Sequence, residues 1–380
     1  MKKKWLAIGI ILLLLSVTIV PIIAQKTERT QPTSRGNWLY VGGSGPGNYT
    51  KIQDAIDDAS DGDFVFVYSG IYYEHLIIDK AICLIGEHRQ TTIVDGQKIG
   101  IVIMIPHDSI VIQGITVQNS GQGMFDRGIV MPSNQPFFSN ITIKDCTVQF
   151  NYGGILLDRA LNSSIINCSI HNNTGASIDI LEESDNIRVL YCSICDNGVS
   201  NIVGGLCCYG NGFIEVASCV IRRNNAEGIG LNVKRADIHN NIIDANREKG
   251  IFISGCWGPY EIMIHNNVIS NTTQTGIWSA GVFIQDCNRN IQIENNSFLS
   301  NVNKGVYLLR SRGVRIQNNN FIGNSGQASF LNSFYNHWSA NYWSDWNGLG
   351  PYPISGGFLL FLRWFQIDWH PAENPHDFGG

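Results

Sequence analysis

The sequence predicts an all-β protein that folds as a single right-handed parallel β-helix. Three observations lead to this fold class. A column of Cys or Asn residues recurs every 22 to 29 positions, and a strand of the form Gly-apolar-x-apolar recurs between its members. The composition, with 40 Gly and only 15% charged residues, favours strands and turns over helices. The net charge of −5 offers no basic surface, so nucleic acid is not an expected partner.

The first residues have the pattern of an export signal. Lys2, Lys3 and Lys4 precede an uncharged run from Trp5 to Ala24. This run is also close to the roughly 20 residues that span a bilayer. Residues 1–24 are therefore either a cleaved signal peptide or a retained membrane anchor, and both alternatives place the protein outside the cytoplasm or at the cell surface. Residues 25–37 are polar and are expected to form a linker.

A short helix is expected to cover the first coil. Thr50 and Gln53 have the spacing of a capping box, apolar side chains follow at helical spacing from Ile52 to Ala59, and Gly62 marks the stop. A covering element is needed because the open end of a β-helix exposes unpaired strands and core.

Two columns define the repeat over residues 38–330, which corresponds to about nine or ten coils. The first column reads Cys146, Cys168, Cys192, Cys219, Asn241, Asn267, Asn296 and Asn319. The second reads Asn151, Asn173, Asn197, Asn224, Asn246, Asn301 and Asn324. Because neighbouring coils lie about 4.8 Å apart, like residues are expected to stack into ladders. Stacked cysteines point in parallel, so buried free thiols are favoured over disulfides.

The tail, residues 331–380, is rich in Trp, Tyr and Phe and is interpreted as a C-terminal cap. The segment from Tyr40 to Ile56 resembles the opening of pectin-lyase-like β-helix proteins. The coils resemble the carbohydrate-binding and sugar-hydrolase β-helix family, which includes the periplasmic maturation protein of nitrous-oxide reductase and many archaeal surface proteins. The resemblance implies the fold and a polysaccharide or cell-envelope glycan as partner. The catalytic motifs of pectinesterases and polygalacturonases do not occur in this sequence.

Charged residues on successive coils are the candidates for catalysis: Asp126, Arg127, Asp158, Arg159, Asp179 and Glu182. Stacked carboxylates are able to act as acid and base on a sugar. Calcium would be needed only if the protein were a lyase, and no other cofactor is expected. The alternative is that these residues form a solvated edge where strand meets turn.

Aromatic residues near two longer coils are candidates for binding sugar. Strand alternation points Phe252, Phe283 and Tyr307 outward, and nearby loops contain Trp257, Tyr260 and Trp278. Aromatic surfaces suit the C–H faces of sugar rings. The alternative is that the aromatic tail folds back over these rings.

Two histidines, His239 and His265, share one column but have no third ligand in register, so no metal site is expected and copper binding is not inferred from the resemblance. The favoured function is a secreted or cell-surface protein that binds polysaccharide or has a structural envelope role without catalysis. The alternative is a polysaccharide lyase, hydrolase or epimerase.

Overall fold

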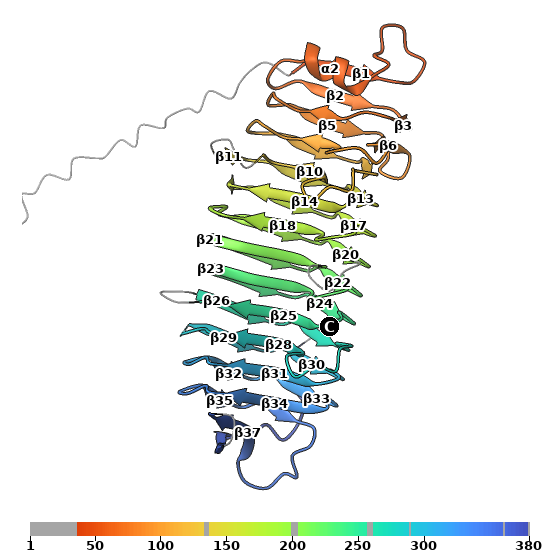
Figure 1. Ribbon diagram of the computed structural model, residues 1–380. Helices are drawn as coiled ribbons and strands as arrows, with labels where there is room; N and C mark the ends of the chain where they lie inside the picture. Colours follow the sequence, from red (N-terminus) through yellow and green to blue (C-terminus); the bar gives the residue numbers. More distant parts are fainter. Residues whose placement is uncertain are drawn as a thin grey trace, which may run out of the picture. The chain divides into compact units, whose positions relative to one another are not determined.

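The computed structural model describes residues 36–132, 137–198, 204–256, 261–288, 290–359 and 362–378. In these residues the chain winds into a parallel β-solenoid of about 13 turns, each stacked on the one before (Figure 1). Each turn contributes strands to three walls, which follow one another along the chain as wall 1, wall 2 and wall 3. The sequence predicts only about nine or ten coils, because the Cys/Asn column by which the coils are counted is absent from the first turns.

The strands of wall 1 are β1 (Trp38–Val41), β2 (Phe64–Val67), β5 (Cys83–Gly86), β8 (Val111–Gln113), β12 (Thr142–Lys144), β16 (Ser164–Ile166), β19 (Ile187–Leu190), β26 (Glu261–His265), β29 (Ile291–Glu294), β32 (Arg315–Gln317), β35 (His337–Ser339) and β38 (Leu362–Asp368). The strands of wall 2 are β3 (Gly70–Tyr72), β6 (Thr92–Asp95), β9 (Thr116–Gln118), β13 (Thr147–Gln149), β17 (Ser169–His171), β20 (Ser193–Cys195), β22 (Val220–Arg222), β24 (Ile242–Asp244), β27 (Val268–Ser270), β30 (Ser297–Leu299), β33 (Asn320–Ile322) and β36 (Tyr342–Trp343).

The strands of wall 3 are β4 (Leu76–Ile77), β7 (Ile103–Met104), β10 (Arg127–Val130), β14 (Gly153–Asp158), β18 (Ile178–Leu181), β25 (Lys249–Ser254), β28 (Ala280–Gln285), β31 (Lys304–Leu309), β34 (Gly326–Leu331) and β37 (Tyr352–Phe358). The long strands β21 (Leu206–Ala217) and β23 (Ile229–His239) run from wall 3 into wall 1. A small pair, β11 (Phe138–Ser139) and β15 (Ala160–Leu161), lies between these walls.

The predicted ladders are confirmed. Strand pairs on either side place Cys146, Cys168, Cys192 and Cys219 in one register, and all four thiols are free and buried. Toward the C-terminus the same column continues as a ladder of amides. Each Asn side chain donates a hydrogen bond to the Asn of the next turn, as from Asn241 Nδ2 to Asn267 Oδ1 at 3.0 Å. The residue before each column member has a positive φ, and this residue rather than the column Asn occupies the left-handed conformation.

The second ladder is interrupted once, by Thr272 between Asn246 and Asn301. The backbone N–H of Thr272 still donates to Asn301 Oδ1 at 3.2 Å. The hydroxyl of Thr272 has no partner among the described residues. A threonine at this position therefore keeps the hydrogen bond from its backbone N–H but interrupts the row of hydrogen-bonded side-chain amides.

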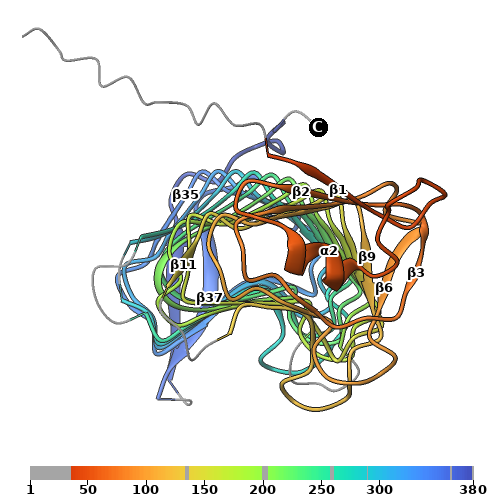
Figure 2. The ribbon, with the colours of Figure 1, turned by 90° about the horizontal axis from the view of Figure 1, so that it is seen from above.

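The helix α2 (Ile52–Asp58) covers the first turn, as predicted, and lies over the interior of the stack (Figure 2). Its predicted capping box is wrong, because no side chain of the N-cap makes a capping bond. The carboxylate of Glu74 accepts the free N–H groups of Ile52 and Gln53 at 2.8 and 2.9 Å instead. A residue from the next strand region thus caps this helix.

The opposite end of the core closes with stacked aromatic rings. Phe298, Phe321, Trp343 and Tyr352 follow one another with ring centroids 4.9, 4.3 and 4.2 Å apart. Parallel pairing continues past residue 330 through β35 and β36, and the antiparallel hairpin β37–β38 follows. Within the described residues, none of the helices has the length and apolar character needed to cross a bilayer.

Candidate functional site

The outward surface of wall 3 brings together most of the candidate residues found in the sequence. One register column on this surface reads Leu156, Asp179, Cys207, Gly230, Phe252, Phe283, Tyr307 and Ser329. Its first half contains Asp179, whose charged contacts define the polar half of the surface, and Phe252, Phe283 and Tyr307 form its aromatic half. The predicted outward direction of Phe252, Phe283 and Tyr307 is confirmed, because Phe283 and Tyr307 belong to a cluster separate from the core, with Phe252 packed against it.

A buried ion pair fixes the polar half. Arg127 Nη2 lies 3.1 Å from Asp179 Oδ2, two turns away, and both side chains are largely buried. Gly153 lies between them, and a Cβ there would be 2.3 Å from Arg127 Cδ, so a glycine allows the arginine to cross. Burial raises the pKa of Asp179, and Arg127 opposes that rise only in part. Loss of either partner would leave the other charge buried and unpaired.

Asp158 lies on the next outward column, and no described residue forms an ion pair with it within 4.0 Å. Its side chain is 4% exposed, and its Oδ1 atom is buried without a hydrogen-bond partner among the described residues. Burial, and then repulsion from Glu182, raise its pKa. This carboxyl is therefore protonated more readily in the folded protein than in the unfolded chain.

Replacing Asp158 with asparagine is expected to stabilise the protein at pH 7 by about 1 kcal/mol, since it removes a carboxylate charge that burial and Glu182 disfavour. Because folding raises this pKa, the favourable contribution of the acid is fully present below the unfolded pKa and is lost as pH rises through the folded one. The two proteins should therefore unfold at the same temperature at pH 3 and differ at pH 7. A variant that is less stable than wild type at pH 7 would contradict this explanation.

The remaining sequence candidates lie nearby but are more ordinary. Arg159 and Glu182 form an ion pair at 3.3 Å that is substantially exposed, and such pairs contribute little stability. Asp126 Oδ2 accepts a hydrogen bond from the backbone N–H of Gly123 at 2.7 Å and so stabilises the local loop of residues 123–126. The structure therefore places Arg127, Asp158 and Asp179 as the partly enclosed charged groups of this surface.

The aromatic half is stacked and largely covered. The rings of Phe252, Phe283 and Tyr307 follow one another at 5.4 and 5.3 Å, and the ammonium groups of Lys249 and Lys304 lie over the first and last ring. Phe283 is only 2% exposed and Tyr307 8%. These rings therefore contribute little accessible surface, although they point outward as predicted.

The loop of residues 271–279 reaches these rings through Trp278, its exposed aromatic side chain. The indole lies 6.1 Å from the ring of Phe283 and 6.2 Å from that of Tyr307, and it is 44% exposed. The loop is fixed by hydrogen bonds, including Gln274 N to Arg247 O at 2.7 Å and Ser279 N to Gly276 O at 3.0 Å. Trp278 is thus a supported and accessible ring, whereas Trp257 and Tyr260 lie outside the described residues.

Tyr209, which the sequence analysis missed, lies between the polar and aromatic halves. It follows outward Cys207 by two positions, so strand alternation would have found it. Its side chain is half exposed and borders an open hollow of about 490 Å³ together with Glu182, Glu183 and Asn211. Burial, followed by Cys207 and by the nearby carboxylates, raises the pKa of Tyr209 to about 12, so the phenol remains a hydrogen-bond donor.

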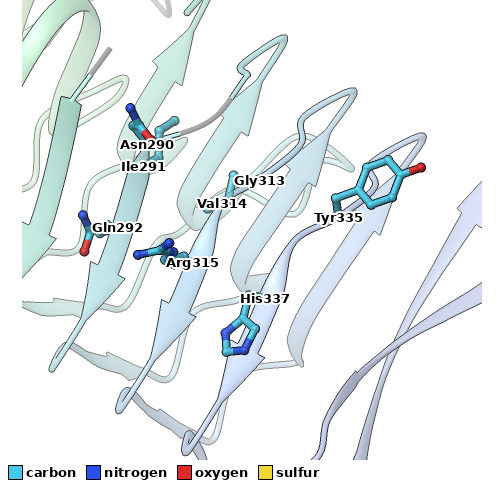
Figure 3. Close-up of a pocket in the computed structure, with 8 residues that line it drawn as sticks. All are labelled: Asn290, Ile291, Gln292, Gly313, Val314, Arg315, Tyr335 and His337. Atoms are coloured by element: carbon cyan, nitrogen blue, oxygen red, sulfur yellow. The ribbon is translucent and has the colours of Figure 1, made fainter. Parts of the chain in front are cut away.

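A second hollow lies on wall 1, across three successive turns (Figure 3). It has a volume of about 340 Å³, and Arg315, Tyr335 and His337 line it with Gln292. The described residues provide no carboxylate that pairs with Arg315 or His337. This hollow is polar and open, and the sequence repeat alone did not distinguish it from other exposed positions.

The histidine column also lies on wall 1. The rings of His239 and His265 stack at 5.1 Å. Their Nε2 atoms face Glu215 at 3.3 Å and Asp237 at 2.9 Å, respectively. Across the described part of the chain, no group of three or more His, Cys, Asp or Glu residues is arranged to hold a metal ion.

Comparison with known proteins identifies the architecture. The family model for the right-handed beta helix region matches residues 86–243, 139–281 and 205–342, which together make up more than half of the chain. No curated protein matches the chain by sequence.

Several solved structures share the fold. The catalytic domain of Agl-KA superposes with a TM-score of 0.57 at 14% identity, over 75% of this chain and 61% of that one, which is less than two thirds of its length. The A-module of the mannuronan C-5 epimerase AlgE4 from Azotobacter vinelandii gives 0.55 at 14% identity, over 85% and 94%. The PL6 family polysaccharide lyase Pedsa3628 from Pseudopedobacter saltans gives 0.54 at 14% identity, over 86% and 88%.

Proposed function

Because the chain belongs to the right-handed β-helix family, we propose that it is an exported protein that binds a polysaccharide along the outward surface of wall 3. The observation that carries this proposal is Trp278, an accessible indole held over a stack of outward aromatic rings. Arg127, Asp179 and Tyr209 lie on the same surface, in neighbouring turns toward the N-terminus. Aromatic and polar groups in one line suit a chain of sugar rings and hydroxyls.

The regular spacing of the turns supports an extended ligand rather than a small molecule. Turns separated by about 4.8 Å repeat the same outward positions along the stack. From Asp179 to Tyr307 the register column passes through six successive strands, so a linear glycan lying along the stack would meet the polar and then the aromatic half. By their names, the mannuronan epimerase and the PL6 lyase act on polysaccharides, which supports the ligand class.

Replacing Trp278 with alanine is expected to weaken polysaccharide binding about tenfold, since stacking on an aromatic ring contributes about 1 kcal/mol or somewhat more. Affinity electrophoresis of the full chain in gels containing mannuronan, α-1,3-glucan or pectin would measure the change. The matched control is Trp364→Ala, which removes an exposed indole from the C-terminal hairpin. Equal loss of binding in both variants, or none in Trp278→Ala, would contradict the proposal.

A catalytic role is the second candidate, and one observation favours it. Asp158 and Asp179 lie on adjacent turns of the same surface, two positions apart along the strand, and both have raised pKa values. Hydrolysis of a glycosidic bond uses two carboxyl groups, one as general acid and one as base or nucleophile. The formation of reducing ends or unsaturated products by the wild-type chain would distinguish this role from binding. Calcium belongs only to a lyase form of this second proposal.

A further inference from the structure

A patch of aromatic side chains covers the outward surface of wall 1 at its N-terminal end. It consists of Trp38 and Tyr40 on β1, and Phe64, Phe66 and Tyr68 on or just after β2. The ring of Trp38 stacks on Phe64 at 4.7 Å, and the ring of Phe66 meets Tyr68 edge to face at 5.1 Å. Trp38 and Tyr40 are 49% and 41% exposed, and the other three rings are partly exposed.

Within the described residues of the two register columns that begin at Trp38 and Tyr40, Trp, Tyr and Phe occur only on β1 and β2. The next outward residues in register are Cys83 and Ile85, and then Val111, all partly exposed. Farther along, the same columns hold Thr142 and Lys144, then Ser164 and Ile166, and then Arg188 and Leu190, so polar and aliphatic side chains replace the aromatic rings. A soluble monomer rarely exposes so many neighbouring apolar groups without a partner.

We propose that this N-terminal aromatic patch lies in the headgroup region of a lipid bilayer into which the apolar run Trp5–Ala24 is inserted. The inference does not depend on glycan binding. Under this proposal, residues 1–24 are a retained membrane anchor and not a cleaved signal peptide.

Chain length connects the patch to the bilayer. The run from Trp5 to Ala24 is long enough for a helix to span a membrane, since about 20 residues suffice. Residues 25–35 separate it from Gly36, two residues before Trp38, and such a spacer extends to at most about 40 Å. An inserted run therefore keeps the patch at a high effective concentration near the lipid surface.

The chemistry of the patch also fits the bilayer interface. Trp and Tyr combine an apolar ring with a polar N–H or O–H, and both are enriched where the hydrocarbon meets water. A second copy of the chain or a glycan would also cover aromatic rings, but neither explains why the patch lies at the end of the solenoid to which the apolar run is attached.

The emission of Trp38 in liposomes tests the proposal. The full chain is reconstituted in vesicles with and without a brominated phospholipid, and the contribution of Trp38 is obtained as the difference between wild type and Trp38→Phe. Trp5 contributes equally to both chains and cancels. We expect the brominated lipid to quench the Trp38 contribution at least about twofold, because quenching requires direct contact with the lipid.

Trp364 supplies the matched control, since it is 56% exposed on the C-terminal hairpin. Its contribution, obtained in the same way with Trp364→Phe, should not change with brominated lipid. Quenching of Trp364 without quenching of Trp38 would show that the other end meets the membrane and would overturn the proposal. Absence of quenching at Trp38, or a mature chain lacking residues 1–24, would also overturn it.

Discussion

Replacing Asn197 with leucine is expected to lower the free energy of unfolding by about 4 kcal/mol. Asn197 is fully buried in the second ladder. Its Nδ2 group donates to Ile170 O, Cys195 O and Asn224 Oδ1 at 2.9–3.1 Å, and its Oδ1 atom accepts from Asn173 N and Nδ2 at 3.1 and 3.0 Å. Leucine would leave several of these groups buried without a partner, at about 1–3 kcal/mol each.

Urea denaturation followed by circular dichroism would measure this loss, and hydrogen exchange would show whether the turns around β20 open first. The control is Asn211→Leu, because Asn211 is exposed beside Tyr209 and substitutions at such positions change stability by about 0.5 kcal/mol or less. If the two variants were equally stable, the ladder would not be the stabilising feature described here.

Replacing Gly205 with alanine is expected to cost at least about 3 kcal/mol, because the added methyl group would meet the backbone of the next turn. An ideal Cβ at Gly205 would lie 1.9 Å from Gly228 O and 2.7 Å from Gly228 C. A carbonyl group of the main chain cannot move aside without separating the turns, so the substitution would disturb stacking over several strands. A decrease in melting temperature of roughly 10 °C is expected by calorimetry.

Gly230→Ala is the matched control, one turn farther along the same wall. The nearest atom to an ideal Cβ there is Glu227 Oε1 at 3.5 Å, an ordinary contact with a flexible side chain. This variant should unfold close to wild type. An equal loss of stability in both variants would mean that a general glycine effect, rather than contact between turns, explains the recurrent Gly-apolar strand.

The sequence was sufficient for the repeating part of the fold, since period and residue type specify which positions stack. The columns beginning at Cys146 and Asn151 appear in register as expected, and the outward position of Cys207 opposite inward Cys208 follows from alternation. The number of turns was underestimated because the first turns use residues other than Cys or Asn at these corners. Periodicity gives no signal where the corner residue changes.

Features formed by loops or by distant residues could not be predicted in this way. Glu74 caps a helix that begins 22 residues earlier, and nothing in the local sequence of the helix indicates that partner. The outward direction of Phe283 is predicted correctly, but its burial depends on the rings stacked on either side of it and on Trp278 from the loop of residues 271–279. Alternation specifies direction, whereas exposure depends on the surrounding loops.

The polar half of the site shows the same limit. The sequence places Arg127 and Asp179 two turns apart, and only the glycine at position 153 allows their side chains to meet. The sequence does not distinguish Asp158 from the other acids, although in the described residues it has a buried oxygen without a hydrogen-bond partner. Pairing and desolvation are properties of the folded surface, so the individual roles of these carboxylates became visible only in the structure.

Hydrogen exchange of the full chain, with and without bound polysaccharide, tests the position of the ligand most directly. New protection is expected in β18, in the wall 3 portions of β21 and β23, and in the loop of residues 271–279, with little change in the strands of wall 2. Protection centred on β1 and β2, or on the hairpin β37–β38, would contradict the assignment of the glycan to wall 3.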